Sequence, residues 1–248
     1  MSDPYEGLAE RYDLFFERFG DHSPAEEAFF RRLFVERGVT SVLDCACGTG
    51  HDLVLFRELG CRVVGSDLSE AMLARAQRNL AGRGLHVPLH QADYRDLPSR
   101  FVERFDAVTC LSSSILHMPD EGEALRAYQS MRGVLREGGI LVLTQGTTDR
   151  QWAEQPRFML AANSPEFTRC FAIDYREQEA TYNILDIWHG AERSELAVWS
   201  CVYPRLLRDD HERLLREAGF ADLAFYGHWD GSPYEKAASR RLIIVAER

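Results

Sequence analysis

The chain has 248 residues, of which 45% are hydrophobic, and this length suits one α/β domain with an added segment or two small domains. Its formal net charge is −10, with arginines dispersed among acidic residues, which argues against a nucleic-acid partner. No apolar run approaches the roughly 18 residues of a membrane span. Residues 1–20 are acidic and aromatic, unlike a signal peptide. We therefore expect no membrane association and a cytoplasmic location.

The cysteines argue against a metal centre. Several of them lie in apolar stretches typical of buried strands, where a thiol behaves as a small hydrophobic group. Cys45 and Cys47 are close in sequence, but no second Cys or His pair completes a four-ligand set, so no metal site is predicted. The six positions are Cys45, Cys47, Cys61, Cys110, Cys170 and Cys201.

Strand and helix patterns alternate over the first part of the chain. Such alternation predicts βαβ units and a parallel sheet. Glycines follow each of the expected helices. Strands are expected at 41–46, 62–67, 86–91, 105–111 and 140–144, and helices at 52–59, 71–80 and 121–135.

The pattern changes after Gln145. Alternating stretches at 179–188 and 195–203 are typical of antiparallel strands, whereas a helix at 209–218 and strands at 223–226 and 242–246 resume the α/β pattern. The sequence thus predicts a Rossmann-like, doubly wound, mostly parallel seven-stranded sheet with an antiparallel β-rich insert after the fifth strand. We expect four parts: an N-terminal helical cap segment (1–40), a nucleotide-binding core (41–145), the insert over the active site (146–204) and a closing helix and strands (205–248).

The first strand-loop-helix unit has the features of a nucleotide site. Gly48 and Gly50 permit a tight turn and close backbone approach, and Asp67 ends the next strand nineteen positions after Gly48. An acid at this spacing bonds ribose hydroxyls in nucleotide-binding folds. Dinucleotide-binding loops carry a third glycine, where this chain has Leu53. A nucleotide without a pyrophosphate is therefore favoured, and an NAD-type oxidoreductase is the weaker alternative.

Five segments, in order, resemble the motifs of class I S-adenosylmethionine-dependent methyltransferases. The resemblance covers about residues 5–145 well and the remainder loosely. It implies an S-adenosylmethionine cofactor and methyl transfer to a small molecule. The segments are Asp44-x-Ala-Cys-Gly48-Thr-Gly50, Asp67-Leu68-Ser69-x-x-Met72-Leu73, Gln91-Ala92-Asp93-Tyr94, Phe105-Asp106-Ala-Val-Thr-Cys-Leu111 and Leu135-Arg-x-Gly138-Gly139-x-Leu141.

The resemblance also implies a set of cofactor-binding residues. Asp67 would bind the ribose hydroxyls, Asp93 the adenine amine, and the Leu111 carbonyl the methionine amine. Each has a plainer alternative: Asp67 as a helix cap, Asp93 as a solvated loop acid and Tyr12 as a helix-face aromatic rather than a cover over the cofactor. The full set is Tyr12, Ala46, Gly48, Gly50, Asp67, Leu68, Met72, Asp93, Tyr94 and Leu111.

Within this superfamily the loop at 110–120 is most similar to that of glycine and glycine/sarcosine N-methyltransferases. His117 matches a His of that loop and is our candidate catalytic residue, as a general base for a hydroxyl acceptor. Alternatively, it is a loop His hydrogen-bonded to the backbone. His189 and Tyr203, in the insert, are weaker candidates.

The chain departs from these relatives in the acceptor region. Ser113 stands where they have Asn, Gly146 where they have the Arg that holds the substrate carboxylate, and His22 or Ser23 where they have another Arg. A desolvated carboxylate needs a cation or several donors, so glycine is not the expected acceptor. The sequence leaves open the acceptor, N- or O-methylation, the oligomeric state and a cofactor-binding protein without transferase activity.

Overall fold

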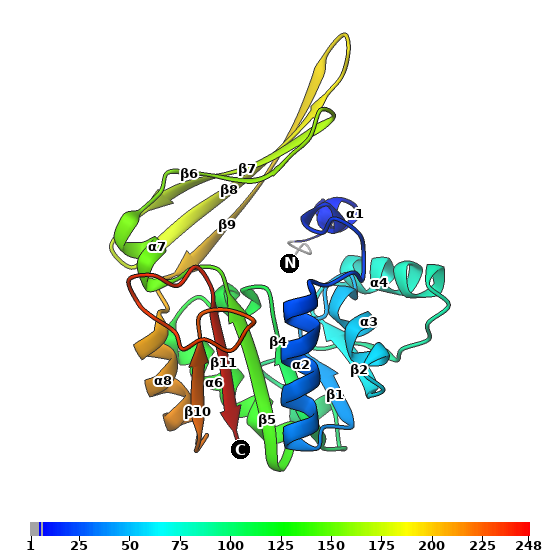
Figure 1. The fold of residues 1–248 in the computed structure, drawn as a ribbon, viewed down its shortest axis with the longest axis vertical. Coiled ribbons are helices and arrows are strands. Elements are labelled where there is room, and N and C mark those ends of the chain that lie inside the picture. The colour runs from blue at the N-terminus through cyan, green and yellow to red at the C-terminus, as the bar shows by residue number, and fades with distance from the viewer. Residues whose placement is uncertain (1–4, 6) are drawn as a thin grey trace.

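The computed structural model describes Tyr5 and residues 7–248, and its centre is a seven-stranded sheet in the order β10-β11-β5-β4-β1-β2-β3 (Figure 1). Strands β1 to β5 run parallel, whereas β11 is antiparallel to both β5 and β10. The predicted Rossmann-like sheet is confirmed. Its strands are β1 (Ser41–Asp44), β2 (Arg62–Asp67), β3 (Leu89–Gln91), β4 (Phe105–Cys110), β5 (Leu135–Gln145), β10 (Leu223–Tyr226) and β11 (Leu242–Glu247).

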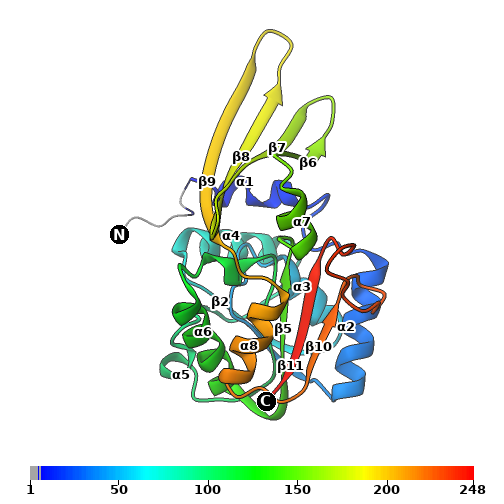
Figure 2. The ribbon, with the colours of Figure 1, turned by 90° about the vertical axis from the view of Figure 1, so that its left-hand side faces the viewer.

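Helices cover both faces of this sheet (Figure 2). Successive strand residues point to opposite faces, so Val42 packs with α2, α3 and α4 while Leu43 packs with α5, α6 and α8. Side-chain caps fix several helix starts, as where the Ser23 hydroxyl accepts from Glu26 N at α2. The helices are α1 (Ala9–Tyr12), η1 (Asp13–Phe15), α2 (Pro24–Arg37), α3 (His51–Glu58), α4 (Glu70–Gly82), α5 (Leu97–Arg100), η2 (Ser114–His117), α6 (Glu121–Val134), α7 (Asp149–Glu154) and α8 (Arg208–Glu217).

A second, four-stranded antiparallel sheet follows α7 and projects from the end of the first sheet where β5 finishes (Figure 1). Its inner face buries Tyr182, Ile184 and Asp186, at alternate positions of one strand. This sheet is the β-rich insert that the sequence predicted after the fifth strand. Its strands are β6 (Phe158–Asn163), β7 (Phe167–Tyr175), β8 (Glu179–His189) and β9 (Ser194–Pro204).

Some boundaries differ from expectation. The third strand begins at Leu89 rather than at residue 86, because Pro88 has no N–H to donate to a ladder. Strand β5 begins at Leu135, five residues earlier than expected, since the chain pairs with β4 on both sides of a register shift between Leu135 and Ile140. In the described part of the chain, no helix combines the length and apolar composition that a membrane crossing requires.

The N-terminal helices α1 and η1 lie apart from α2, between the second sheet and helix α4 (Figure 1). Arg11 contacts Asp186 of β8, and Asp13 contacts Arg75 of α4. This short segment therefore connects the second sheet with helix α4. It lies at the carboxyl ends of the parallel strands, where ligands bind in folds of this type.

Candidate active site

Two cavities adjoin at the carboxyl ends of the parallel strands. The loop cavity, of about 360 Å³, lies beside the loop that follows β1, and the sheet cavity, of about 340 Å³, lies beneath the second sheet. Both are lined by Tyr5, Tyr12, Ser114 and His117, so these four residues mark their boundary. Eight of the ten predicted cofactor-binding residues line the loop cavity: Tyr12, Ala46, Gly48, Asp67, Leu68, Met72, Asp93 and Tyr94.

The glycines of the loop have different roles. Gly48 has a φ of +51°, and a Cβ added there would lie 3.8 Å from Cε1 of Tyr12, so a larger side chain would intrude on the space beneath that ring. Gly50 has a φ of +89°, and an added Cβ would lie 3.3 Å from Cβ of Ala76. Gly50 does not line the loop cavity; its lack of a side chain lets α3 pack closely on α4.

Asp67 forms the acidic wall of the loop cavity. Its Oδ2 accepts a hydrogen bond from Gly48 N at 2.8 Å, and its Oδ1 accepts one from Ser69 N at 2.9 Å. The N-cap of α4 is Ser69, whose hydroxyl accepts from Met72 N. Asp67 is therefore not that helix's N-cap; its carboxylate joins the glycine loop to the start of α4.

Asp93 lies across the same cavity and is paired with Arg95, whose Nε donates to Oδ2 at 2.9 Å. Burial opposes ionisation of Asp93, but the hydrogen bonds from Arg95 outweigh it and lower the pKa of the carboxyl. The Tyr94 hydroxyl donates to Ser114 O at 2.9 Å, which ties this wall to the cavity boundary. Leu68, which lines the same cavity, is 57% exposed and offers an apolar surface for a flat ring.

Leu111 does not line the loop cavity. Its side chain is buried in the core on the α2–α4 side, and its carbonyl accepts a hydrogen bond from Ser114 N at 3.1 Å. A ligand amine would have to share that carbonyl with the turn.

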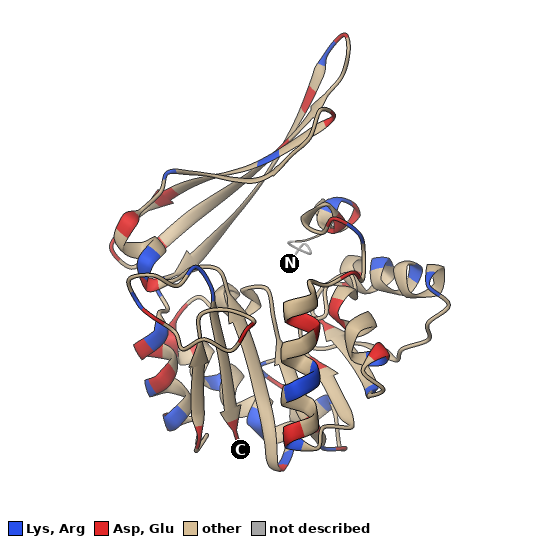
Figure 3. Cartoon of the chain, in the orientation of Figure 1, with Lys and Arg blue, Asp and Glu red and all other residues tan. Residues whose placement is uncertain are grey.

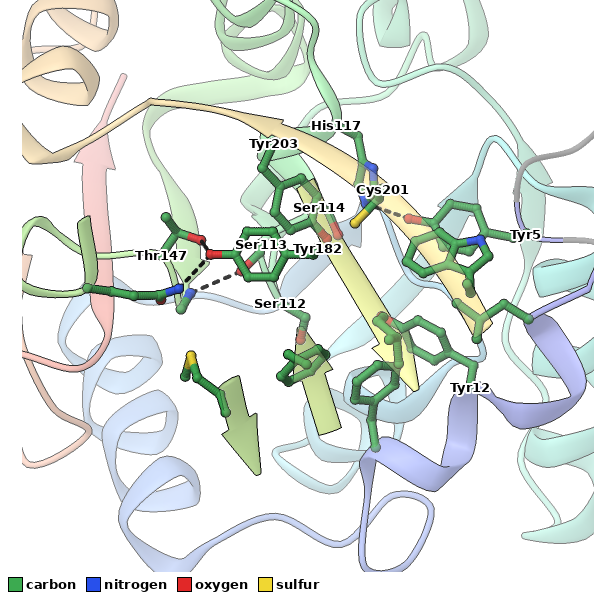
Figure 4. A pocket seen from close by; sticks show the side chains of 18 of the residues that line it. Tyr5, Tyr12, Ser112, Ser113, Ser114, His117, Thr147, Tyr182, Cys201 and Tyr203 are labelled. Carbon is green, nitrogen blue, oxygen red and sulfur yellow. Dashed lines mark hydrogen bonds between the residues drawn. The ribbon is translucent and has the colours of Figure 1, made fainter. Parts of the chain in front are cut away.

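The sheet cavity has an uncharged lining: among the described residues around it, none is Asp, Glu, Lys or Arg. Burial lowers the pKa of His117 to about 4, so its imidazole is neutral near pH 7. Its Nε2 is hydrogen-bonded to the Tyr5 hydroxyl. Farther in, the Tyr182 hydroxyl meets Thr147 Oγ1 at 2.9 Å and accepts from Gln151 Nε2 at 2.6 Å (Figure 4).

Ser112 and Ser113 line this cavity with strained backbones, since their φ angles are +55° and +68°. The amides of both donate to Thr144, to Oγ1 and to O respectively, each at 2.8 Å. Ser113 Oγ in turn accepts from Gly146 N at 3.0 Å. The structure thus brings together Ser113 and Gly146, two of the three positions at which the sequence is expected to depart from the glycine N-methyltransferases.

Most of the wall that the second sheet contributes was not predicted from the sequence. Tyr182 and Ile184 of β8, and Trp199, Cys201 and Tyr203 of β9, all line the sheet cavity. Their spacing of two residues is the signal that marks one face of a strand. Of the two weaker catalytic candidates in the insert, Tyr203 has its ring centroid 5.1 Å from that of His117. His189 is exposed at the far end of β8 and contacts Thr168.

A side chamber of about 310 Å³ adjoins the sheet cavity, and both are lined by Phe16, Ser112, Ser113 and Gly146. Unlike the sheet cavity, it has charged groups in its lining. They are Glu26, Asp52 and Arg241, with the His51 imidazole beside them. Burial, with the nearby Asp52, raises the pKa of Glu26 to about 7.

His22, His51 and Asp52 form the one group of potential metal ligands among the described residues, with ligand atoms within 4.8 Å of one another. Nδ1 of His51 accepts a hydrogen bond from Gly20 N at 2.9 Å, so the neutral ring carries its proton on Nε2 and has no lone pair for an ion there. Nε2 of His22 instead bonds Asp52 Oδ1 at 2.9 Å. The group fits a hydrogen-bonded cluster better than a metal centre.

Comparison with known proteins shows the family. Residues 42–139 match the model of a methyltransferase domain. The glycine/sarcosine N-methyltransferase of Parasynechococcus marenigrum (strain WH8102) is 39% identical over 145 residues, which are 58% of this chain and about half (51%) of that protein. The glycine/sarcosine N-methyltransferase of Aphanothece halophytica is 30% identical over 225 residues, covering 90% of this chain and 81% of that protein.

Among solved structures, the sugar N-methyltransferase KedS8 from Streptoalloteichus sp ATCC 53650 is 28% identical, with a TM-score of 0.71 over 96% of this chain and 92% of that chain. The chain belongs to the class I S-adenosylmethionine-dependent methyltransferases. Its activity is methyl transfer from S-adenosylmethionine, as the sequence predicted.

Proposed function

We propose that this enzyme is an N-methyltransferase whose acceptor is an amine of a small molecule with no carboxylate beside that amine. The observation that carries the proposal is the uncharged sheet cavity, which meets the loop cavity at a neutral His117. Only an acceptor that enters without charge fits such a lining at low energetic cost.

The reaction requires the acceptor nitrogen to have a lone pair. Burial disfavours the charged form of an ammonium group, so an uncharged cavity lowers the pKa of a bound amine and enriches its nucleophilic form. A hydroxyl acceptor would need a general base, and an imidazole whose pKa is about 4 is a weak one. A carboxylate would lose its hydration without a cation in return.

The names of the relatives agree with a nitrogen acceptor, since glycine/sarcosine N-methyltransferases and a sugar N-methyltransferase are among them. The sheet cavity suits an amino sugar better than it suits glycine or sarcosine. Hydroxyl groups of Ser112, Ser114 and Thr147 line it, and such groups both donate to and accept from sugar hydroxyls. We therefore favour an amine on a hydroxylated, carbohydrate-like body.

The roles of the cofactor-binding residues are part of this proposal. When bound, S-adenosylmethionine supplies a methyl group that its sulfonium already activates. Asp67 accepts from the ribose hydroxyls, Leu68 and Met72 pack against the adenine, and Asp93 accepts from the adenine amine. The exposed apolar surface of Leu68, in a cavity that both carboxylates line, supports this fit.

The remaining predicted residues lie near the methionine end of the cofactor or support the walls of the site. Backbone at Ala46 and Gly48 approaches the methionine moiety, and the Leu111 carbonyl faces its amine. Gly50 supports the loop, while Tyr94 lines the wall next to Asp93 and Tyr12 covers the loop from above. His117 lies at the boundary of the two cavities and orients the acceptor rather than removing a proton.

We also propose the division of the chain into a cap segment (1–40), a cofactor-binding core (41–145), an insert over the active site (146–204) and a closing part (205–248). Acidic and basic residues are interspersed on the cartoon rather than gathered by sign (Figure 3), which supports the absence of a nucleic-acid partner. A cytoplasmic location belongs to the same proposal.

The test is a panel of matched acceptors with the purified enzyme and S-adenosylmethionine, read as S-adenosylhomocysteine release and product mass. Amino sugars are compared with the same sugars bearing a hydroxyl in place of the amine, and with glycine and sarcosine. We expect methylation of amino sugars alone. Turnover of the hydroxyl analogues but not of the amines, or of glycine as readily as of amino sugars, would refute the proposal.

A further inference from the structure

A salt bridge is buried in the second sheet, and neither partner lines the loop cavity, the sheet cavity or the side chamber. Arg169 of β7 and Asp186 of β8 are cross-strand neighbours, and their side chains are 0% and 1% exposed. Arg169 Nε donates to Oδ1 at 2.6 Å and Nη2 donates to Oδ2 at 2.9 Å. Burying two charges is unfavourable unless further contacts offset the loss of hydration, so the contacts around the pair matter.

Those contacts come from the N-terminal segment. Arg11 Nη1 donates to Asp186 Oδ2 at 3.2 Å, and Arg169 Nη2 donates to the carbonyl of Arg11 at 3.2 Å. The Arg169 guanidinium also lies 3.9 Å from the ring centroid of Phe15, within cation–π range. The buried pair therefore binds Arg11 through both its side chain and its backbone, and holds η1 through Phe15.

The segment held in this way covers the reaction site. We name Tyr5 and residues 7–16 the lid segment. Tyr5 and Tyr12 line both cavities, and Leu8, Phe15 and Phe16 line the sheet cavity (Figure 4). A ligand that fills both cavities is thus covered by the lid segment, and its exchange with solvent requires that segment to move.

The opposite side of the lid segment is held by α4, through more exposed groups. Glu10 pairs with Arg78, whose side chains are 61% and 59% exposed, and Asp13 accepts from Arg75 Nε at 2.9 Å. Exposed pairs contribute little to stability because water and salt screen them. Asp13 and Arg75 are 16% and 28% exposed, so their pair is the firmer contact on the α4 side. The attachment to the second sheet differs because it is built on a fully buried ion pair, Arg169–Asp186.

We propose that the Arg169–Asp186 pair is a latch that holds the lid segment closed over the boundary of the two cavities, with Arg11 as the residue through which it acts. Opening of the latch admits the cofactor and releases the products. The proposal rests on the proposed function in one respect, that the loop cavity holds S-adenosylmethionine. Arg11, Arg169 and Asp186 are positioning residues in this account.

One feature of the closed arrangement favours reversible opening. Nη1 of Arg169 is buried and has no hydrogen-bond partner among the described residues. An unsatisfied buried donor destabilises the state that contains it. Water that enters upon opening would satisfy this donor. The unsatisfied donor therefore offsets part of the stability of the closed state, and the lid segment can still open.

The primary test compares Arg11→Met, which removes the latch contact, with Arg78→Met, which removes an exposed contact of the same lid segment. Loss of a hydrogen bond between charged groups should speed amide hydrogen exchange in residues 7–16 about tenfold in Arg11→Met. In Arg78→Met the change should be below about threefold. Arg11→Lys, which keeps a donor for Asp186, should restore slow exchange at least in part.

Kinetics provide the second readout. Arg11→Met should raise KM for S-adenosylmethionine about tenfold while kcat stays the same or increases, because a looser lid weakens retention of the cofactor and speeds product release. Equal exchange in Arg11→Met and Arg78→Met would overturn the latch, as would a loss of kcat with KM unchanged. A double variant, Arg169→Met with Asp186→Leu, removes the pair without leaving a lone buried charge and should reproduce the Arg11→Met result.

The exchange measurement needs no acceptor, so it separates the two proposals. Calorimetry with S-adenosylhomocysteine on the parent enzyme tests whether the loop cavity takes the cofactor. If the parent binds it and exchange in residues 7–16 does not respond to Arg11→Met, the latch fails and the proposed function stands. If exchange responds and the acceptor panel shows no amine methylation, the proposed function fails and the latch stands.

Discussion

Tyr5 and His117, 112 positions apart in the chain, are joined by a hydrogen bond between the tyrosine hydroxyl and the imidazole Nε2 at the boundary of the two cavities. Their rings meet edge to face, with centroids 5.6 Å apart. The contact fixes the imidazole plane at the point where, in the proposed function, the cofactor and the acceptor meet. Because burial keeps this imidazole neutral near pH 7, it offers orientation rather than charge.

The role of His117 can be tested with His117→Gln, which keeps a hydrogen-bonding group of similar length. An amine acceptor needs no general base, so kcat for an amine should fall less than about tenfold, whereas loss of a general base typically costs 10² to 10⁴ in rate. Steady-state kinetics at pH 8 measures the effect, and Tyr5→Phe serves as the companion variant for the lost hydrogen bond. A drop of three orders of magnitude would identify His117 as a base after all.

Asp67 gives a prediction on cofactor affinity. Asp67→Ala removes the proposed acceptors for ribose hydroxyls and also the hydrogen bond from Gly48 N to the carboxylate. We expect the Kd for S-adenosylhomocysteine to increase at least about tenfold, since hydrogen bonds to a charged group contribute roughly 1.5–3 kcal/mol. Isothermal titration calorimetry measures this. Glu70→Ala, a nearby exposed acid outside the cavity, is the control and should leave Kd unchanged; equal effects would mean that Asp67 acts only through net charge.

The cofactor half of the site was predictable because it depends on local sequence. A tight loop, a strand-terminal acid and a helix start occur within about 25 residues, and parallel strands bring their ends to one edge of the sheet. Asp67 could therefore be placed by its spacing, whereas Leu68 and Asp93 were placed by the resemblance of their segments to the methyltransferase motifs. The loop cavity indeed contains them, although their roles in binding stay predictions.

The acceptor half depends on contacts between distant segments. Tyr182 and Tyr203 face the cavity only because β8 and β9 pair in one register, and a shift by one residue would turn the opposite set of side chains inward. The Arg169–Asp186 pair is likewise a cross-strand relationship, and nothing in either local sequence indicates that Arg11 lies against it. The sequence patterns located the insert, but they did not show which of its faces lines the sheet cavity.

The side chamber leads to a prediction about acceptors that carry a carboxylate, such as sarcosine. Gly146 adjoins it, and a Cβ added at Gly146 would meet only Ser113 Oγ, at 4.0 Å, so a larger residue fits there. Gly146→Arg alone should barely improve turnover of sarcosine, because Glu26 and Asp52 in the same chamber compete for the new guanidinium.

Combining Gly146→Arg with Glu26→Gln removes one competitor. The double variant should raise kcat/KM for sarcosine about tenfold or more over the parent, because the new arginine would form a charge-assisted pair with the sarcosine carboxylate. Gly146→Gln with Glu26→Gln is the control for size without charge. If that control gains as much as the arginine variant, the missing cation is not what excludes carboxylate-bearing amines.

The pH dependence of stability should carry a contribution from His211, which is fully buried between the Tyr128 hydroxyl and Gln145 Oε1. Burial lowers its pKa to about 3, below the value of about 6.5 expected when unfolded. As the pH falls below 6.5, His211 becomes protonated in the unfolded chain but stays neutral in the folded chain. Stability therefore decreases, by up to about 1.4 kcal/mol per pH unit, and above pH 6.5 this contribution is constant.

The variant His211→Gln removes this titration together with the hydrogen bonds of the ring. It should be less stable than the parent at pH 7, but the difference in free energy of unfolding should shrink by about 2 kcal/mol between pH 7 and pH 5, as the parent alone loses stability through the buried ring. Urea denaturation at both pH values measures the difference. The control is His228→Gln, which removes an imidazole that is 64% exposed. A parent–variant difference that is the same at pH 7 and pH 5 would show that His211 takes up its proton as readily in the folded chain as in the unfolded one.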